Sequence, residues 1–419
     1  FLRYAEDAGD SENQQRYGLI MQAETQFSAA LSFTDPEIQA IPDDIMGEYL
    51  ADKRIAEFDI MLQKILRFKP HVLSANEERL LALQNEAAAA PGKAFEALTD
   101  VDMDFGAIET KEGSRPLSQG TLSAFLIDPD RSVRERAYTQ FYAVYEAHKN
   151  TLAALYTGSV QQDIYRAKVH NYPSARAAAL FPDDVPEAVY DNLITAVHDG
   201  FPVLHRYYEL RKKLLKVDEL RHYDVYVPLV ENIRTDYPYE EGVEVIAEAL
   251  APLGDEYVAT LRSGLLGNWV DRYENKGKRS GAFSAGSYLG EPYILMNYKP
   301  NVLRNLFTLA HEGGHSMHSW YSVRNNPFQH YSYTIFEAEV ASTFNEQLLA
   351  RYLLDRAEDD SMKAYIIGKQ LDDIIATIFR QTMFAEYEQL VHAQVEAGSP
   401  LTVKSLRDTY RELLSSYFG

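Results

Sequence analysis

The helical spacing of apolar residues over most of the chain is the pattern that most restricts its fold. Segments 14–66 and 76–99 are rich in Ala, Leu, Glu, Gln and Lys and poor in glycine, a composition that favours helix. Apolar residues recur there at spacings of three and four, as in the stripe Ile55, Phe58, Met61, Leu62, Ile65 and Leu66. Such a stripe is typical of a helix packed on other helices. The sequence therefore predicts a mostly α-helical protein, with a break between Pro36 and Pro42.

Two stretches interrupt the helical pattern. Residues 104–120 contain three glycines and one proline around a polar segment, which predicts a short hairpin or a linker. We place a domain boundary there, between an N-terminal helical region at 1–110 and a second region at 111–419. Residues 282–298 combine aromatic and aliphatic side chains with three glycines or prolines, which predicts one or two strands.

Composition excludes several classes of protein. The chain has no cysteine, which excludes disulfide scaffolds, thiolate metal sites and cysteine nucleophiles. Its formal net charge of −21 argues against a nucleic-acid partner, because such a surface needs a basic stripe. No apolar run approaches the ~18 residues of a membrane span, and the first residues lack a signal-peptide pattern. We therefore expect a cytoplasmic protein, and a processed chain or fragment because it begins at Phe1.

The sequence His-Glu-Gly-Gly-His at 311–315 carries the strongest chemical signal. Residues four apart lie on one face of a helix, so His311 and His315 can bind one zinc ion. Glu312 would then lie beside the metal-bound water and accept its proton. The alternative is a packing or surface role for the histidines. We disfavour it because residues 302–310 predict a buried helix, where polar groups without a partner are costly.

A catalytic zinc site needs a third protein ligand. A metzincin would have glycine at 318 and histidine at 321, where this chain has His318 and Tyr321. No acidic residue occurs from 316 to 336, which excludes zincins whose third glutamate lies about 20 residues downstream. Glu339 and Glu346 are seven apart on one face of a predicted helix, so one can bind the metal while the other holds a ligand histidine. The apolar row of this helix is expected to be Phe336, Val340, Phe344 and Leu348.

These motifs together resemble a known family. Segment 311–319, followed 24 residues after His315 by segment 339–346, is closely similar to the M3 metallopeptidases and, among them, to the oligoendopeptidase F branch. The resemblance covers nearly the whole chain. It continues through segments 130–138, 172–175, 223–229, 277–282 and 292–298.

The resemblance implies a metalloendopeptidase with one Zn²⁺ per chain. It implies that His311, His315 and Glu339 are the metal ligands and that Glu312 is the catalytic base. It also implies that Glu346 supports a ligand histidine by a hydrogen bond from outside the coordination shell. The implied fold is mostly α, a two-lobed helical zincin-type metallopeptidase around a deep channel, with a small β-sheet beside the zinc-binding helix.

The implied substrates are short oligopeptides, because folded proteins cannot enter such a channel. An extended peptide would add itself to the edge of a strand at 282–288. His318 lies on the face of the two ligand histidines but a turn further along, so we expect a supporting or core role for it. His330, Tyr331 and Tyr333 could donate a hydrogen bond to the substrate carbonyl, although packing or surface roles are favoured for each.

Two departures from the family pattern leave alternatives open. The family usually has a bulky residue where this chain has Gly313, which loosens the helix beside the base. The family also continues past residue 419 into a C-terminal segment that supplies a histidine and tyrosines, so we expect that segment to be missing here. One alternative is therefore a catalytically impaired, peptide- or metal-binding fragment of such an enzyme. Another is a helical scaffold whose histidines are structural.

Overall fold

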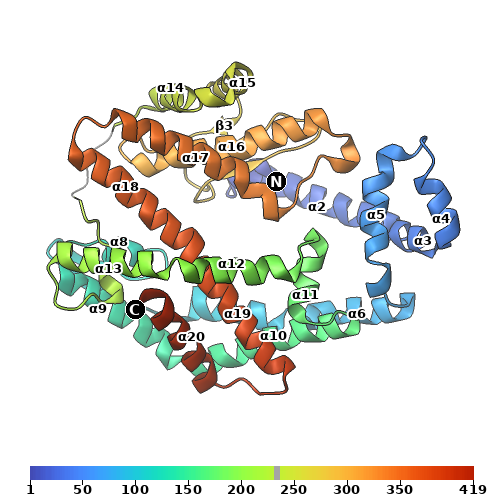
Figure 1. Ribbon diagram of the computed structural model, residues 1–419, viewed down its shortest axis with the longest axis horizontal. Coiled ribbons are helices and arrows are strands. Elements are labelled where there is room, and N and C mark those ends of the chain that lie inside the picture. Colours follow the sequence, from blue (N-terminus) through green and yellow to red (C-terminus); the bar gives the residue numbers. More distant parts are fainter. Residues whose placement is uncertain (231–235) are drawn as a thin grey trace. The chain divides into compact units, whose positions relative to one another are not determined.

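The computed structural model describes residues 1–230 and 236–419, and helices dominate it (Figure 1). The mostly helical fold that the apolar spacing predicts is confirmed. Contacts divide the chain into two compact units, each assembled from two stretches of sequence. Unit 1 comprises Phe1–Lys69 and Ile233–Ile366, and unit 2 comprises Pro70–Asn232 and Ile367–Gly419. These limits differ from the predicted boundary at 110/111, which stays a prediction about domain organisation.

The elements of unit 1 are, in chain order, α1 (Leu2–Glu6), α2 (Ser11–Leu31), α3 (Thr34–Ala40), α4 (Asp43–Leu50), α5 (Asp59–Arg67), α14 (Tyr239–Ala249), α15 (Asp255–Leu266), β3 (Val270–Asp271), β4 (Phe283–Ala285), β5 (Tyr293–Leu295), α16 (Leu303–Asn325) and α17 (Ile335–Arg356). The first residues of α18 (Asp360–Ile374) also belong to it.

The elements of unit 2 are α6 (Ala75–Ala88), α7 (Ala90–Glu96), β1 (Ala107–Thr110), β2 (Gly113–Pro116), α8 (Leu122–Leu126), α9 (Arg131–Ala147), α10 (Lys149–Val169), α11 (Ala175–Leu180), α12 (Glu187–Asp199), α13 (Phe201–Leu215), α19 (Arg380–Glu396) and α20 (Val403–Phe418). Two π-helical turns, η3 (Ala97–Asp102) and η8 (Ile375–Phe379), and a short 3₁₀ turn, η5 (His222–Asp224), also lie in unit 2.

The predicted continuity of segment 14–66 is only partly right. The break at Pro42 is confirmed, since this residue precedes α4, but the chain also leaves the helix at Ser32 and after Leu50. After Leu50 the Asp52 carboxylate accepts hydrogen bonds from both the backbone and the side chain of Arg54. This local turn competes with helical hydrogen bonding, so the first two residues of the expected stripe lie before α5.

The expected hairpin is confirmed. Strands β1 and β2 pair antiparallel, with Thr110 opposite Gly113 at the turn. Gly113 has φ +115°, a conformation that glycine adopts without a steric penalty. The buried residue of the hairpin, Ile108, packs with Phe125, Val133 and Phe141, so the hairpin shares a hydrophobic core with α8 and α9.

The strands predicted within 282–298 are confirmed as β4 and β5, and β3 completes a small sheet of order β3-β5-β4. Strand β4 pairs antiparallel with β5, with Ser284 opposite Ile294, while β3 pairs parallel with β5. This order leaves β4 at one edge of the sheet. Strand β4 also packs against α16, so the sheet lies beside the helix that carries the histidine pair.

The largest core cluster of unit 1 surrounds α16. It includes Ile246, Leu265, Ile294 and Leu309, all with no exposed surface. Of the apolar residues expected to bury this helix, only Val302, at 36%, is substantially exposed. The prediction of a buried helix is therefore confirmed.

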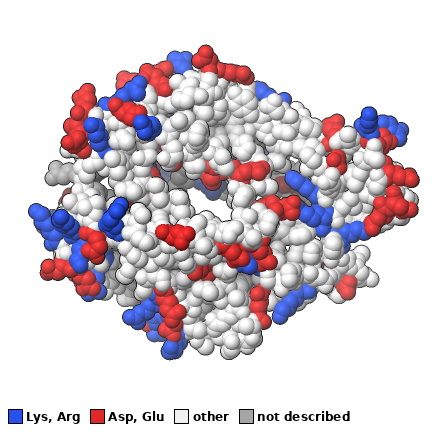
Figure 2. All heavy atoms as spheres, in the orientation of Figure 1, with Lys and Arg blue, Asp and Glu red and all other residues white. Residues whose placement is uncertain are grey.

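No helix in the described ranges is both long enough and apolar enough to cross a membrane. On the face that Figure 2 shows, basic and acidic side chains are interspersed.

Candidate metal centre

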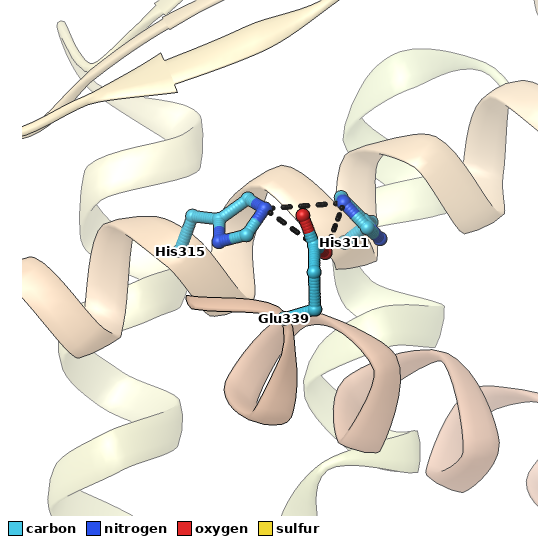
Figure 3. Close-up of side chains that lie close together, drawn as sticks. All are labelled: His311, His315 and Glu339. Carbon is cyan, nitrogen blue, oxygen red and sulfur yellow. Dashed lines mark hydrogen bonds and ion pairs between the residues drawn. The ribbon is translucent and has the colours of Figure 1, made fainter. Parts of the chain in front are cut away.

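His311 and His315 lie one turn apart on α16, and their side chains point to the same place (Figure 3). Their Nε2 atoms are 3.1 Å apart. Both side chains are largely buried, at 25% and 17% exposed. The i, i+4 spacing thus brings two imidazole nitrogens to one side of a helix that the core holds in place.

The glycines inside the motif allow α16 to approach its neighbours. A Cβ on Gly314 would lie 2.7 Å from the Cα of Ser342 and 2.8 Å from the carbonyl oxygen of Ala341, both on α17. A Cβ on Gly313 would lie 3.1 Å from Leu261 on α15. Because backbone cannot move as a side-chain tip can, Gly314 fixes the close contact of the two helices. The close contact between the helices explains why a buried helix carries glycine here, although glycine is unfavourable inside helices.

Glu339 reaches the histidines from α17 (Figure 3). Its Oε2 lies 3.3 Å from Nε2 of His311 and 3.5 Å from Nε2 of His315. Tetrahedral ligands at zinc-bond lengths of about 2.0–2.2 Å lie roughly 3.3–3.6 Å from one another. Two of the three separations between these atoms, 3.3 and 3.5 Å, lie within this range, and the third, 3.1 Å, lies slightly below it. The residues present fit a divalent metal with two imidazoles and one carboxylate.

Further groups orient this set. Oε1 of Glu346 lies 3.0 Å from Nδ1 of His311, so a proton on Nδ1 leaves the Nε2 lone pair free to face Glu339. Ser342 donates to Oε2 of Glu339 at 2.7 Å. Burial alone would lower the pKa of His311, but the hydrogen bond and charge of Glu346 raise it. Burial and the charge of His311 lower the pKa of His315.

Glu312 is 6% exposed, although a carboxylate is seldom buried. Burial raises the pKa of Glu312 to about 7, opposed by His311 and reinforced by the charge of Glu339. The backbone of Ser284 on β4 donates a hydrogen bond to the Glu312 carboxylate, and this lowers the pKa in part. A carboxylate with a pKa near 7 can both accept and return a proton at neutral pH.

The other polar residues expected near the site have partners elsewhere. His318 stacks on Tyr333 with ring centroids 3.7 Å apart, and its buried Nδ1 has no hydrogen-bond partner in the described part of the chain. The hydroxyl of Tyr333 lies 2.9 Å from that of Ser319. His330 contacts the backbone oxygen of Glu57 at 2.7 Å, and Tyr331 packs on Tyr288. His318 therefore holds the loop before α17 by stacking.

The apolar row expected on α17 is mostly not buried. Phe336, Val340 and Phe344 are 62%, 67% and 53% exposed, and only Leu348 packs against the core of unit 1. The buried face consists of Ser342, Asn345, Leu349 and Ala350 instead. Small and polar residues serve there because α16 and α17 approach so closely, and that proximity cannot be read from periodicity.

The role of Asn345 was not predicted from the sequence. Its side chain is 1% exposed, donates to the carbonyl oxygen of Ala310 at 3.1 Å and accepts from Tyr257 at 3.1 Å. It thus fixes α17 to the backbone directly before His311. A polar residue inside a helix was the one available signal, and it does not identify its partners.

Fold and site together define the class of protein. A buried helix with two converging imidazoles, an adjacent buried carboxylate and a third ligand from a neighbouring helix is the arrangement of a metallohydrolase.

The chain belongs to peptidase family M3. The model described as "Peptidase family M3" matches residues 124–419, more than half of the chain, and the model described as "Oligopeptidase F" matches residues 37–105. Within the family its relatives are oligoendopeptidase F proteins, so the chain is of the peptidase class of hydrolases.

Two curated relatives and two solved structures show the extent of the similarity. The chain is 43% identical over its full length to an oligoendopeptidase F homolog of Borreliella burgdorferi, of which it covers 70%. It is 42% identical to oligopeptidase PepF of Bacillus subtilis, of which it covers 62%. A crystal structure of a Chlamydophila abortus protein described as a peptidase matches 99% of this chain and 69% of that one, with TM-score 0.91 and 35% identity. The oligoendopeptidase-F of Enterococcus faecium matches 100% and 70%, with TM-score 0.74 and 35% identity.

Proposed function

We propose that this chain carries the centre of a zinc-dependent metalloendopeptidase that hydrolyses short oligopeptides. The observation that supports it most is the trio of 3.1, 3.3 and 3.5 Å separations among the ligand atoms of His311, His315 and Glu339. Two nitrogens and one carboxylate oxygen suit zinc, and three protein ligands leave a fourth position open. Because the chain spans 62–70% of the length of these two relatives, the activity of the whole protein is part of the proposal.

Each group would have a separate role in peptide hydrolysis. Zinc, when bound, would lower the pKa of a coordinated water and polarise the scissile carbonyl. Glu312 would accept the proton of the attacking water and return it to the leaving amine, a task suited to a pKa of about 7. Glu346 would keep Nε2 of His311 directed at the metal by its contact with Nδ1.

Strand β4 offers a way to hold the peptide. It lies at the edge of its sheet and pairs with β5 alone among the described strands. The backbone of Ser284 on this strand also contacts Glu312. A peptide that adds itself to β4 by backbone hydrogen bonds would therefore pass beside the base. Recognition through the backbone suits substrates of varied sequence. The restriction to short peptides, and an internal channel that imposes it, rest on the resemblance to the family.

One observation favours a second candidate, a peptide- or metal-binding protein with impaired catalysis. A donor to the developing oxyanion is worth about 10²–10³-fold in rate. The groups best suited to donate, His330 and Tyr333, have partners on Glu57 and Ser319 within unit 1.

The deciding experiment measures metal content and turnover together. The protein is loaded with zinc, washed, and assayed for metal by mass spectrometry and for cleavage of a quenched fluorescent oligopeptide. We expect about one zinc per chain and cleavage that falls by about 10³-fold in Glu312→Gln while the zinc remains. Zinc without cleavage would establish the second candidate. Absence of both would leave a helical scaffold with structural histidines.

A further inference from the structure

One guanidinium of unit 2 lies against an aromatic ring and has no ion pair among the described residues. Arg380, the first residue of α19, forms no ion pair or hydrogen bond with its side chain within the described part of the chain. It contacts the ring of Tyr226, with Cζ 5.5 Å from the centroid. Other arginines of unit 2 are paired: Arg134 with Asp224, Arg176 with Glu187, and Arg407 with Glu146.

Tyr226 belongs to a series of polar aromatic side chains that contact one another. His222 lies edge-on to Tyr226 at 5.7 Å, and Tyr138 on α9 packs against His222 at 5.5 Å. The rings of Tyr142 and Tyr138 also contact each other, with centroids 4.5 Å apart. Tyr410 on α20 lies close enough to Tyr226 and Arg380 to interact with them electrostatically. Four parts of unit 2, namely α9, the segment after α13, α19 and α20, thus bring a guanidinium and several phenol groups together.

The tyrosine hydroxyls of this group are available to a ligand. Those of Tyr138, Tyr142, Tyr226 and Tyr410 have no hydrogen-bond partner among the residues that the structure describes. Burial raises the pKa of Tyr142 to about 12, and burial also raises the pKa values of Tyr138 and Tyr410, so these hydroxyls stay protonated. They are therefore neutral hydrogen-bond donors at physiological pH.

The remaining charged groups near the cluster do not neutralise Arg380. Burial lowers the pKa of His222, and Arg380 lowers it further, so the imidazole is neutral. Two carboxylates of the surrounding structure have partners of their own. Asp224 accepts hydrogen bonds from Arg131 and Arg134, and Asp372 accepts one from Tyr207 at 3.0 Å and lies 3.6 Å from Arg211. Among the described residues, the cluster thus combines one guanidinium that has no ion-pair partner with several hydroxyl donors.

We propose that Arg380 and the hydroxyls of Tyr138, Tyr142, Tyr226 and Tyr410 form a binding site for an anionic group, a carboxylate or a phosphate. A guanidinium donates two parallel hydrogen bonds to either anion, and phenols add further donors. The terminal carboxylate of a peptide is the source that fits this chain best, an assignment that rests on the proposed peptidase function. This site within unit 2 would then recognise the free C-terminus of a peptide.

The test compares a short fluorescent peptide with its C-terminal amide. Binding is measured by anisotropy on Glu312→Gln protein, so that no cleavage occurs and the result does not depend on turnover. We expect the free acid to bind at least about tenfold more tightly than the amide, because a neutral amide cannot accept two parallel charge-assisted hydrogen bonds from Arg380. Arg380→Gln should bring the ratio to about one, and Tyr226→Phe should reduce it. Arg407→Gln, the same change at an arginine paired with Glu146, should leave it unchanged.

A second arm tests inorganic phosphate alone by calorimetry. Phosphate binding that disappears in Arg380→Gln, with acid and amide peptides bound equally, would keep the anion site and make phosphate its ligand. If neither probe depends on Arg380 in variants of unchanged thermal stability, the proposal is overturned. Zinc content is measured on every variant. A protein without zinc that still discriminates acid from amide would refute the proposed function and leave the anion site standing.

Discussion

Two clusters of charged residues, one in each unit, show opposite ways of placing carboxylates inside a protein. In unit 2, Asp224 has no exposed surface and accepts hydrogen bonds from Arg131 at 2.8 Å and Arg134 at 2.9 Å. The carboxylate there is paired with cations of the chain itself. In unit 1, Glu312, Glu339 and Glu346 surround two histidines, and neither Lys nor Arg is paired with them in the described residues. The first cluster is complete, whereas the second is complementary to a cation that the chain does not supply.

The difference separates stability from function. A balanced buried pair is costly to break, since removing one partner leaves the other charge without compensation. An unbalanced acidic cluster contributes little to folding and gains its favourable interactions only when a metal binds. Substitutions in the two clusters should therefore have effects of different kinds.

The largest expected effect on stability comes from Asp224→Asn. It leaves Arg131 and Arg134 without their carboxylate, so we expect unfolding free energy to fall by about 3–5 kcal/mol. Urea unfolding followed by circular dichroism measures it. Asp191→Asn is the matched control: its side chain is 52% exposed, so the loss should stay below about 1 kcal/mol. Equal losses of unfolding free energy in the two variants would contradict the proposed difference between the buried and the exposed carboxylate.

The pH dependence of stability sharpens the same point. Burial would raise the pKa of Asp224, but the hydrogen bonds from Arg131 and Arg134 outweigh it and lower the pKa. A carboxyl group with a lowered folded-state pKa contributes stability above its unfolded value of about 3.9, and that stability is lost as pH falls through the folded value. Below about pH 4, wild-type protein should therefore lose stability more steeply than Asp224→Asn. Parallel acid-unfolding curves would contradict this assignment.

In the metal cluster, Glu339→Ala should act on binding and not on folding. We expect zinc affinity to fall by more than about 100-fold, because outer hydrogen-bond partners alone account for 10–100-fold. Stability without metal should change little, since the side chain is 61% exposed. Competition with a fluorescent chelator measures affinity. Glu337→Ala, two residues away and in the first turn of α17, is expected to retain zinc.

A smaller effect is expected from Glu346→Gln. The amide keeps the shape but loses the negative charge that holds the Nδ1 proton of His311. Zinc affinity should fall by about 10–100-fold. A loss as large as that of Glu339→Ala would indicate that Glu346 is itself a metal ligand.

The smallest effect is expected on the exposed row of α17. Phe336→Ser removes a side chain that is 62% exposed, so stability should change by less than about 0.5 kcal/mol. Leu349→Ala on the same helix, with no exposed surface, should cost about 2–5 kcal/mol. Thermal unfolding of both variants measures the difference. A large loss for Phe336→Ser would mean that this face is packed after all.

Local signals predicted much of the fold. The helical spacing, the hairpin at 107–116 and the strands at 283–285 and 293–295 follow from residue type and periodicity, which act within a few residues. The missed ends of helices have local but weaker causes, such as the Asp52 turn. Which face of α17 is buried could not be predicted, because that depends on how closely another helix approaches.

The sequence by itself determined that His311 and His315 share a helix face and that Glu312 sits beside them, because helix geometry fixes neighbours four residues apart. It left Glu339 and Glu346 as alternatives until the likeness to a family favoured one. Only the tertiary structure places Glu339 near Nε2 of both histidines and Glu346 at Nδ1 of His311, through the contact that Gly314 permits with Ser342 and that Asn345 secures. Packing distance between helices depends on volumes far apart in the chain, and no local pattern encodes it.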